Sequence, residues 1–315
     1  MDLTVDGPEV GVEVVEAMER GLARMGRPDA EVLVTSDLQA AVRRLDTSVP
    51  AYTTQRGGGE VAGRTVITPE VSVIVLSDQY LRKSSPHDIE RILAHEAGHL
   101  VLGESGEEVG SERLSVKPGW RWKLRYIGGT ALEEYRIERA MYDLGYGSSE
   151  MAESDSVSSS LHVLNCRVFE AMADPRSHAD TVYFEAMILA ALSDFAKVLA
   201  YCGALSLSGR GRDYPRRELN HFGQANWDDF VGTHWGERLD FFETIPDVRQ
   251  AGISRFETNV WLQAANLEQE LLKRIGFIFQ GPPDGGNYYF TRRQDDQVVE
   301  SRLSRASEEA MVREA

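Results

Sequence analysis

One short run, residues 92–102 (ILAHEAGHLVL), constrains this chain more than any other part of it. It holds the H-E-x-x-H pattern, with His95 and His99 four positions apart and Glu96 directly after the first histidine. Every other residue of the run is apolar or glycine, which predicts a helix that passes through a hydrophobic core. Positions i and i+4 lie on one face of a helix, so both imidazoles can reach one ion. We therefore expect His95 and His99 to bind zinc and Glu96 to act as the general base on zinc-bound water.

The alternative is that His95 and His99 are core histidines bonded to the backbone and Glu96 is a surface acid. A degenerate, metal-free relative of a peptidase belongs to the same alternative. Glu96 is the only acid between Arg91 and Gly103. A buried lone carboxylate is costly unless it is paired or lies near a metal, so the zinc interpretation accounts better for all three residues together.

A catalytic zinc site needs a third protein ligand, and the sequence excludes two common schemes for it. A third histidine in the extended pattern H-E-x-x-H-x-x-G-x-x-H would require glycine at 102 and histidine at 105, where this chain has Leu102 and Ser105. A scheme with aspartate after a Gly-Thr pair fails as well, because Gly129-Thr130 is followed by Ala131.

The third scheme uses a glutamate on a later helix, and the run 131–139 (ALEEYRIER) fits it. Glu134 and Glu138 would lie on one face, with Glu134 as the metal ligand and Glu138 accepting a hydrogen bond from a ligand imidazole. Glu133 is the rival ligand, one residue out of phase. The alternative for this run is an exposed helix with Glu–Arg pairs, a frequent meaning of such charge density.

The motif at 95–99 and the run Leu132–Glu138 together resemble the gluzincin metallopeptidases, the thermolysin-like class that includes small cytoplasmic minigluzincins. The resemblance covers about residues 71–145. It implies one zinc ion per chain, a glutamate as third ligand, and a peptide or protein as substrate. It also implies that a strand before the motif helix forms the edge of the cleft and pairs with an extended substrate, and the run 71–76 is expected to be that strand.

The patterning of the whole chain predicts an α+β fold that is mostly helical. A small antiparallel sheet within about residues 31–77 should pack on the motif helix. It is expected to contain a short strand at 31–34 and the strand-like runs 61–67 and 71–76, which are joined by a short Thr-Pro-Glu turn. A helical C-terminal lobe should supply Glu134. The expected ranges are 1–130 for an N-terminal lobe, 131–282 for the helical lobe and 283–315 for an extension or tail.

The segment 104–129 is expected to be irregular. Its aromatic residues Trp120, Trp122 and Tyr126 alternate with basic residues, which favours a packed β-hairpin or a lid. Five residues elsewhere have side chains that could stabilise an oxyanion, although no motif surrounds any of them: His162, His221, His234, Tyr183 and Tyr142.

The composition of the chain limits the partners that it is expected to bind. The chain has 315 residues, 42% of them apolar, and a formal charge of −16, which is unfavourable for binding nucleic acid. Cys166 and Cys202 are expected to be free thiols, and no leader is visible, so a cytoplasmic location without membrane contact is expected. The most apolar stretch, 181–202, contains three charged residues and is expected to be a core helix.

Two other classes of function stay open at this stage. One is a zinc hydrolase or lyase that acts on a small molecule in a biosynthetic pathway. The other is a non-catalytic binding or regulatory protein on a peptidase-like scaffold, whose C-terminal helical half would be the working part.

Overall fold

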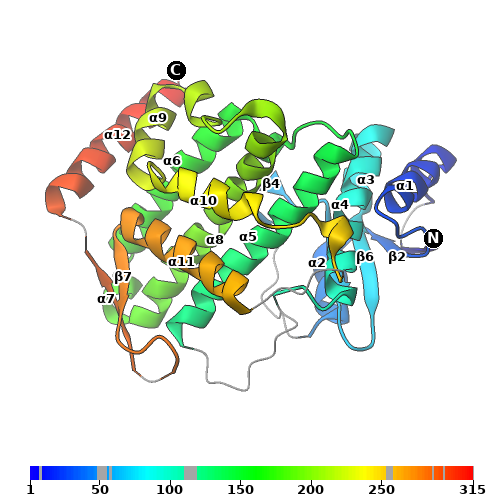
Figure 1. Ribbon diagram of the computed structural model, residues 1–315, viewed down its shortest axis with the longest axis horizontal. Helices are drawn as coiled ribbons and strands as arrows, with labels where there is room; N and C mark the ends of the chain where they lie inside the picture. Colours follow the sequence, from blue (N-terminus) through cyan, green and yellow to red (C-terminus); the bar gives the residue numbers. More distant parts are fainter. Residues whose placement is uncertain are drawn as a thin grey trace. The chain divides into compact units, whose positions relative to one another are not determined.

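A computed structural model of the protein describes residues 1–6, 9–47, 55–56, 59–109, 119–252, 258–285, 287–293 and 295–314 (Figure 1). The fold is α+β and mostly helical, as expected, with 67% of the residues in helices. The chain divides into two compact units, each discontinuous in sequence. Unit 1 comprises Met1–Ser111, Ile137–Gly147 and Pro246–Ser254, and unit 2 comprises Glu112–Arg136, Ser148–Ile245 and Arg255–Ala315.

Unit 1 is built on a four-stranded sheet with the order β1-β2-β6-β5. The expected antiparallel pair is present as β5 (Gly63–Ile67) and β6 (Ser72–Ser77), but the expectation of an antiparallel sheet is wrong for the rest. Strand β1 (Asp2–Asp6) is parallel to β2 (Glu31–Thr35), and β2 is parallel to β6. The physical reason is that helix α1 (Val12–Arg24) connects β1 to β2, and a helical crossover returns the chain in the same direction.

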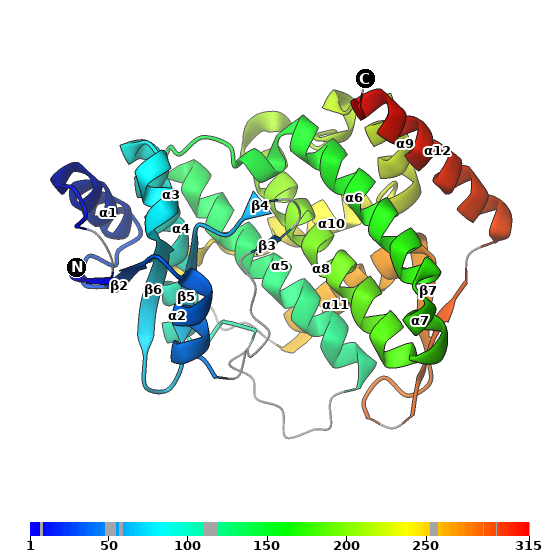
Figure 2. The same ribbon diagram turned by 180° about the vertical axis from the view of Figure 1, so that it is seen from behind.

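Helices cover both faces of this sheet, as Figure 2 shows. One face packs against α1 and α4 (Pro86–Glu104), and the other packs against α2 (Leu38–Leu45). Because side chains alternate along a strand, neighbours in sequence serve different faces. The residues that face α1 and α4 are Val32, Val34, Ile74 and Leu76. Those that face α2 are Leu33, Val66, Val73 and Val75.

Helix α4 carries the H-E-x-x-H run and is defined at its start by a capping box. Ser85 accepts a hydrogen bond from the backbone of Asp88, whose carboxylate accepts one from the backbone of Ser85, and Pro86 occupies the first turn. The helix continues through Gly103 as far as Glu104. The absence of a side chain at Gly21 lets α1 approach α4 closely, because a Cβ atom there would lie 2.9 Å from Cβ of Leu93.

Unit 2 is a bundle of helices with one β-hairpin (Figure 1). The hairpin consists of β7 (Phe277–Gln280) and β8 (Tyr289–Arg292), which are antiparallel. The helices are α5 (Trp120–Asp143), whose last turns belong to unit 1, α6 (Ser154–Ala173), α7 (Pro175–Ala179), α8 (Thr181–Leu205), α9 (His221–Phe230), α10 (His234–Glu243), α11 (Thr258–Ile275) and α12 (Asp296–Glu314).

Short elements occur in both units. Unit 1 contains β3 (Gln55–Arg56), β4 (Gly59–Glu60), α3 (Asp78–Lys83) and a single turn at Val248–Gln250, and unit 2 contains single turns at Glu150–Ala152, Ser206–Arg210 and Arg216–Glu218.

The expectation that residues 104–129 are irregular, with a β-hairpin at the aromatic cluster, is wrong for residues 120–129, which are helical. Gly128, near the end of the segment expected to be irregular, lies inside α5, where a Cβ atom would come within 2.7 Å of the Ala264 carbonyl oxygen. Its lack of a side chain therefore serves a close approach to α11. Trp120 stacks on Phe279 at a centroid distance of 5.3 Å. Residues 110–118 lie outside the described part of the chain.

The end of the chain contributes to the core of unit 2. In α12, Arg302, Ala306 and Glu309 are buried, and this helix packs along α6. The segment Thr181–Arg210 is long and apolar enough to cross a membrane by length and composition. Within its most apolar window, 72% is buried inside the protein.

Replacing Gly21 with alanine should destabilise unit 1. A Cβ atom there would lie 2.3 Å from the Glu90 carbonyl oxygen, so α1 and α4 must separate. We expect a loss of about 1–3 kcal/mol, measured by urea unfolding. Gly236 on α10 is the matched control, because a Cβ atom there meets nothing within 4 Å. Gly236→Ala should be neutral or stabilising by up to about 1 kcal/mol, and equal losses in both variants would contradict the packing argument.

Candidate metal centre

Helix α4 presents its two histidines side by side. The ring centroids of His95 and His99 are 5.3 Å apart, with an angle of 71° between the ring planes. His95 is buried and His99 is half-buried. Because the two residues are one helical turn apart, they occupy the same face of α4, which is the arrangement that a shared metal ion requires.

Helix α5 brings Glu134 to these histidines. His95, His99 and Glu134 each offer one ligand atom, and these atoms lie within 4.8 Å of one another. The helix is uninterrupted and packs on α4 at Gly98, where a Cβ atom would come 2.8 Å from Cγ1 of Ile137. Glu134 lies one turn before that contact region. Its place beside the histidines therefore follows from the course of one helix.

Glu138 holds His95 in position. Its Oε1 atom is 2.9 Å from Nδ1 of His95, and its Oε2 atom accepts a hydrogen bond of 2.6 Å from Nη2 of Arg91. The Glu138 side chain is completely buried. A carboxylate beside Nδ1 favours the tautomer that carries its proton there, and this leaves Nε2 free to bind a metal. The expected partnership of Glu138 with a ligand histidine is present.

Two residues of helix α8 fix the carboxylate of Glu134. The Tyr201 hydroxyl donates to Oε2 at 3.0 Å, and Nζ of Lys197 lies 3.4 Å from Oε1. The motif analysis missed both. A signal was present, because Lys197 is a cation in a strongly apolar helix and Tyr201 follows it by one turn. A half-buried cation of this kind is stabilised by an acidic partner.

The interpretation of run 131–139 as an exposed charged helix is wrong. Four of its charged side chains are buried: Glu133, Glu134, Arg136 and Glu138, with 5%, 7%, 1% and 0% of their surface exposed. Burial of so many charges on one helix is costly unless they take part in a built polar site. Glu133 is as buried as Glu134, but Glu134 is the one grouped with the histidines.

Glu96 contacts strand β5. The Thr65 hydroxyl oxygen lies 2.8 Å from the Glu96 carbonyl oxygen and 2.7 Å from its Oε2 atom. The one hydroxyl proton can serve one of these acceptors at a time, so it can follow the charge on the carboxylate. Both residues are buried, with Glu96 6% exposed.

The strand expected at the edge of the sheet, 71–76, is an inner strand instead. As β6 it pairs with β2 on one side and with β5 on the other, so both of its hydrogen-bonding edges are used. Strand β5 stands at the end of the strand order and contacts Glu96 through Thr65. The sequence could not distinguish the two strands, because adjacent antiparallel strands carry similar apolar patterns.

Three of the five residues considered for oxyanion stabilisation each contact an acidic side chain outside the metal-ligand cluster. His162 lies 3.1 Å from Glu309, and His234 lies 2.9 Å from Glu237. The Tyr183 hydroxyl is 2.9 Å from Asp174, and this hydrogen bond raises the pKa of the tyrosine. His221 starts helix α9, and Tyr142 lies on α5 one turn beyond Glu138.

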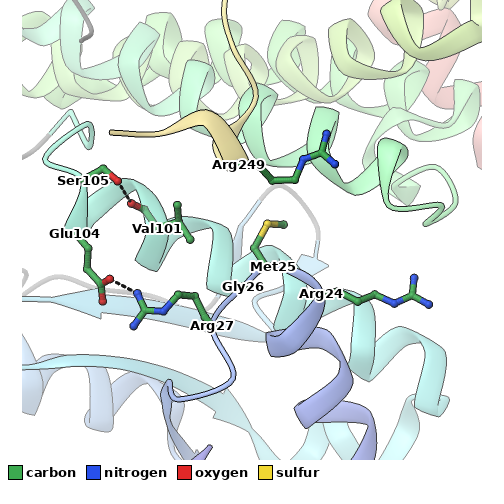
Figure 3. Close-up of a pocket in the computed structure, with 8 residues that line it drawn as sticks. All are labelled: Arg24, Met25, Gly26, Arg27, Val101, Glu104, Ser105 and Arg249. Carbon is green, nitrogen blue, oxygen red and sulfur yellow. Dashed lines mark hydrogen bonds and ion pairs between the residues drawn. The ribbon is translucent and has the colours of Figure 1, made fainter. Parts of the chain in front are cut away.

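A cavity of about 600 Å³ lies in unit 1 at the C-terminal ends of α1 and α4 (Figure 3). It is lined by Arg24, Arg27, Arg249 and Glu104 among others, and by none of the three clustered ligands. Its arginines are already paired: Arg27 with Glu104, Arg24 with Glu90, and Arg249 with Asp143 and Asp247. This cavity is therefore separate from the metal-ligand cluster and offers no uncompensated positive charge.

The donor set itself fits a transition metal. Two imidazole nitrogens and one carboxylate oxygen are the three-ligand combination of catalytic zinc sites, and the buried Glu138 supplies the outer hydrogen bond that such histidines require. Comparison with known proteins adds nothing to this geometry: no protein-family model, no curated protein and no solved structure matches the chain.

Proposed function

We propose that this protein is a zinc-dependent metallopeptidase, with one zinc ion held by His95, His99 and Glu134 and with Glu96 as general base. The observation that carries the proposal is the three-ligand cluster, in which the acid that orients His95 also comes from α5. An isolated H-E-x-x-H run can arise by chance. Two glutamates one turn apart, one beside both histidines and one bonded to His95, make chance a poor explanation.

Zinc bound there would polarise the scissile carbonyl and acidify the attacking water. Glu96 takes the proton of that water, holds it on its carboxylate and delivers it to the leaving nitrogen. Thr65 can donate to Oε2 of the Glu96 carboxylate, and it can turn to the Glu96 carbonyl oxygen once that carboxylate carries the proton. The base is thus oriented by a neutral partner that does not compete for the proton.

The peptide character of the substrate is inferred from strand β5. This strand ends the sheet order and lies against the general base. An extended peptide that pairs with such an edge presents its backbone carbonyls at regular spacing along it. A substrate of this kind would be positioned by main-chain hydrogen bonds, with little dependence on its side chains.

The proposal is tested by two measurements on the same purified protein. Elemental analysis should find about one zinc per chain, and a mixture of unstructured peptides should be cleaved in a way that a chelator stops and added zinc restores. If the protein binds zinc but cleaves none of the peptides, the proposed peptidase activity is wrong. If the protein binds no metal, the assignment of the metal site is wrong.

Replacing Glu138 with glutamine should weaken zinc binding by about 10–100-fold. The amide has the same shape, but its NH2 group can donate a hydrogen bond to Nδ1 of His95. This favours the tautomer that carries its proton on Nε2, which then cannot bind the metal. The measurement is competition with a coloured zinc chelator. Asp143, five residues further along α5 and paired with Arg249, provides the control, and Asp143→Asn should leave zinc affinity unchanged.

Replacing Thr65 with valine should lower kcat about tenfold or less while zinc content stays at one per chain, because one hydrogen bond to the base is lost. Thr65→Ser keeps the hydroxyl and should retain most of the activity. Valine and serine variants with the same kcat would show that the hydroxyl plays no part in orienting Glu96.

A further inference from the structure

Unit 2 contains a second cluster of reactive side chains, which the proposed zinc chemistry does not use. His162 and Cys166 lie one turn apart on α6, and the Cys166 sulfur is 3.5 Å from Nε2 of His162. The other ring nitrogen, Nδ1, is 3.1 Å from Oε2 of Glu309 on α12. A thiol, an imidazole and a carboxylate therefore follow one another in space, the order in which nucleophile, base and orienting acid occur in thiol enzymes.

The carboxylate determines what the imidazole can do. Glu309 is 2% exposed, and its Oε2 atom is also 3.4 Å from Nδ2 of Asn226. A carboxylate beside Nδ1 favours the tautomer with the proton on that nitrogen, which leaves the Nε2 lone pair directed at the thiol. The Nδ1 atom lies 3.1 Å from the Glu309 oxygen but lacks the alignment of a hydrogen bond, so Glu309 acts on His162 mainly through its charge.

The two cysteines of the chain differ sharply in their surroundings. Cys202 is completely buried in α8, and this burial raises the pKa of its thiol, which makes it inert. Cys166 is half-buried and has a base beside it. The contrast means that one cysteine is placed to react with a reagent from solvent, while the other provides an internal reference.

We propose that Cys166 is a modification site that takes up small disulfides by thiol–disulfide exchange, with His162 as the base. His162 Nε2 accepts the thiol proton while the Cys166 sulfur attacks one sulfur of the small disulfide. A new S–S bond forms, the old one breaks, and the leaving thiolate takes the proton from His162. The products are a mixed disulfide on Cys166 and one small thiol, so Cys166 is oxidised and the small disulfide, which is the oxidant, is reduced.

The test uses the full-length protein with two probes, the coloured disulfide reagent DTNB and oxidised glutathione. We expect one fast equivalent with DTNB, one glutathione adduct by mass spectrometry, and Cys166 as the modified residue in both cases. His162→Gln and Glu309→Gln should each slow the DTNB reaction, the former by at least about tenfold. His178→Gln is the matched control, because His178 is exposed on α7, and it should react at the wild-type rate.

Folding is monitored in the same experiment by Cys202, which stays unreactive only while unit 2 is folded. A His162→Gln protein with protected Cys202 and an unchanged Cys166 rate would overturn the proposal. So would equal reactivity of the two cysteines in the wild-type protein. If His162→Gln exposes Cys202, the rate of Glu309→Gln decides in its place, and a wild-type rate in that variant would likewise overturn the proposal.

Discussion

Replacing Glu96 with glutamine should lower kcat for peptide hydrolysis by about 10²–10⁴-fold, the range that a positioned general base supplies. Glutamine keeps the size and the contact with Thr65 but cannot accept the proton of the attacking water. The zinc content should stay at one per chain, because Glu96 is outside the ligand cluster. The measurements are steady-state hydrolysis of a fluorogenic peptide and elemental analysis of the same preparation.

The pairing of these two readouts separates chemistry from metal binding. His95→Ala provides the contrasting variant, since it should lose both zinc and turnover. A Glu96→Gln protein that retains zinc and hydrolyses peptide at the wild-type rate would remove Glu96 from its proposed role, although the metal cluster could stand. A Glu96→Gln protein that loses zinc would mean that Glu96 acts on the ligands themselves.

The residues on helix α4 were predictable because their chemistry depends on local spacing alone. His95 and His99 lie on one face of any helix, and the apolar frame around them signals burial. Glu138 was predictable for the same reason, since it follows Glu134 by one turn. The structure adds the contact with His95 at 2.9 Å.

The residues that the sequence could not supply act across long separations. Thr65 contacts Glu96 across 31 positions, and Tyr201 contacts Glu134 across 67. No local pattern marks Thr65, and the signal for Tyr201 is its place one turn after Lys197 in an apolar helix. Strand β1 is not predicted, because only its alternate residues are partly buried. The parallel direction of β1, β2 and β6 is not predicted either. The direction of a strand depends on the connection that precedes it, and a helical crossover makes two neighbouring strands parallel. The apolar pattern of the strands alone does not reveal this direction.

The start of helix α5 shows a different kind of failure. Gly128 and Gly129 have low helix propensity and look like a boundary, yet they lie inside a helix of 24 residues. Tertiary packing overrides the propensity there, because Gly128 lets α5 and α11 approach each other. The same long helix carries Glu134 to the histidines, so the misplaced boundary did not affect the ligand itself.

The identity of the third ligand gives the second large expected effect. Neighbouring residues on a helix point about 100° apart, so Glu133 and Glu134 cannot both face the histidines. Since Glu134 belongs to the cluster and is held by Tyr201 and Lys197, Glu134→Gln should weaken zinc binding by at least about 100-fold, more than the loss of an outer hydrogen bond does. Hydrolysis should fall in proportion at limiting zinc.

Glu133→Gln is the matched control for this prediction, because it makes the same chemical change one residue away at a side chain that is equally buried. Its zinc affinity should equal that of the wild type, even if burial of a new amide lowers stability. Zinc competition titrations on both variants, with thermal melts recorded on the metal-free proteins, distinguish a lost ligand from a weakened fold. The reverse outcome, with Glu133→Gln losing zinc and Glu134→Gln keeping it, would mean that α5 turns by one residue when the ion binds and that the cluster assigned to Glu134 is wrong.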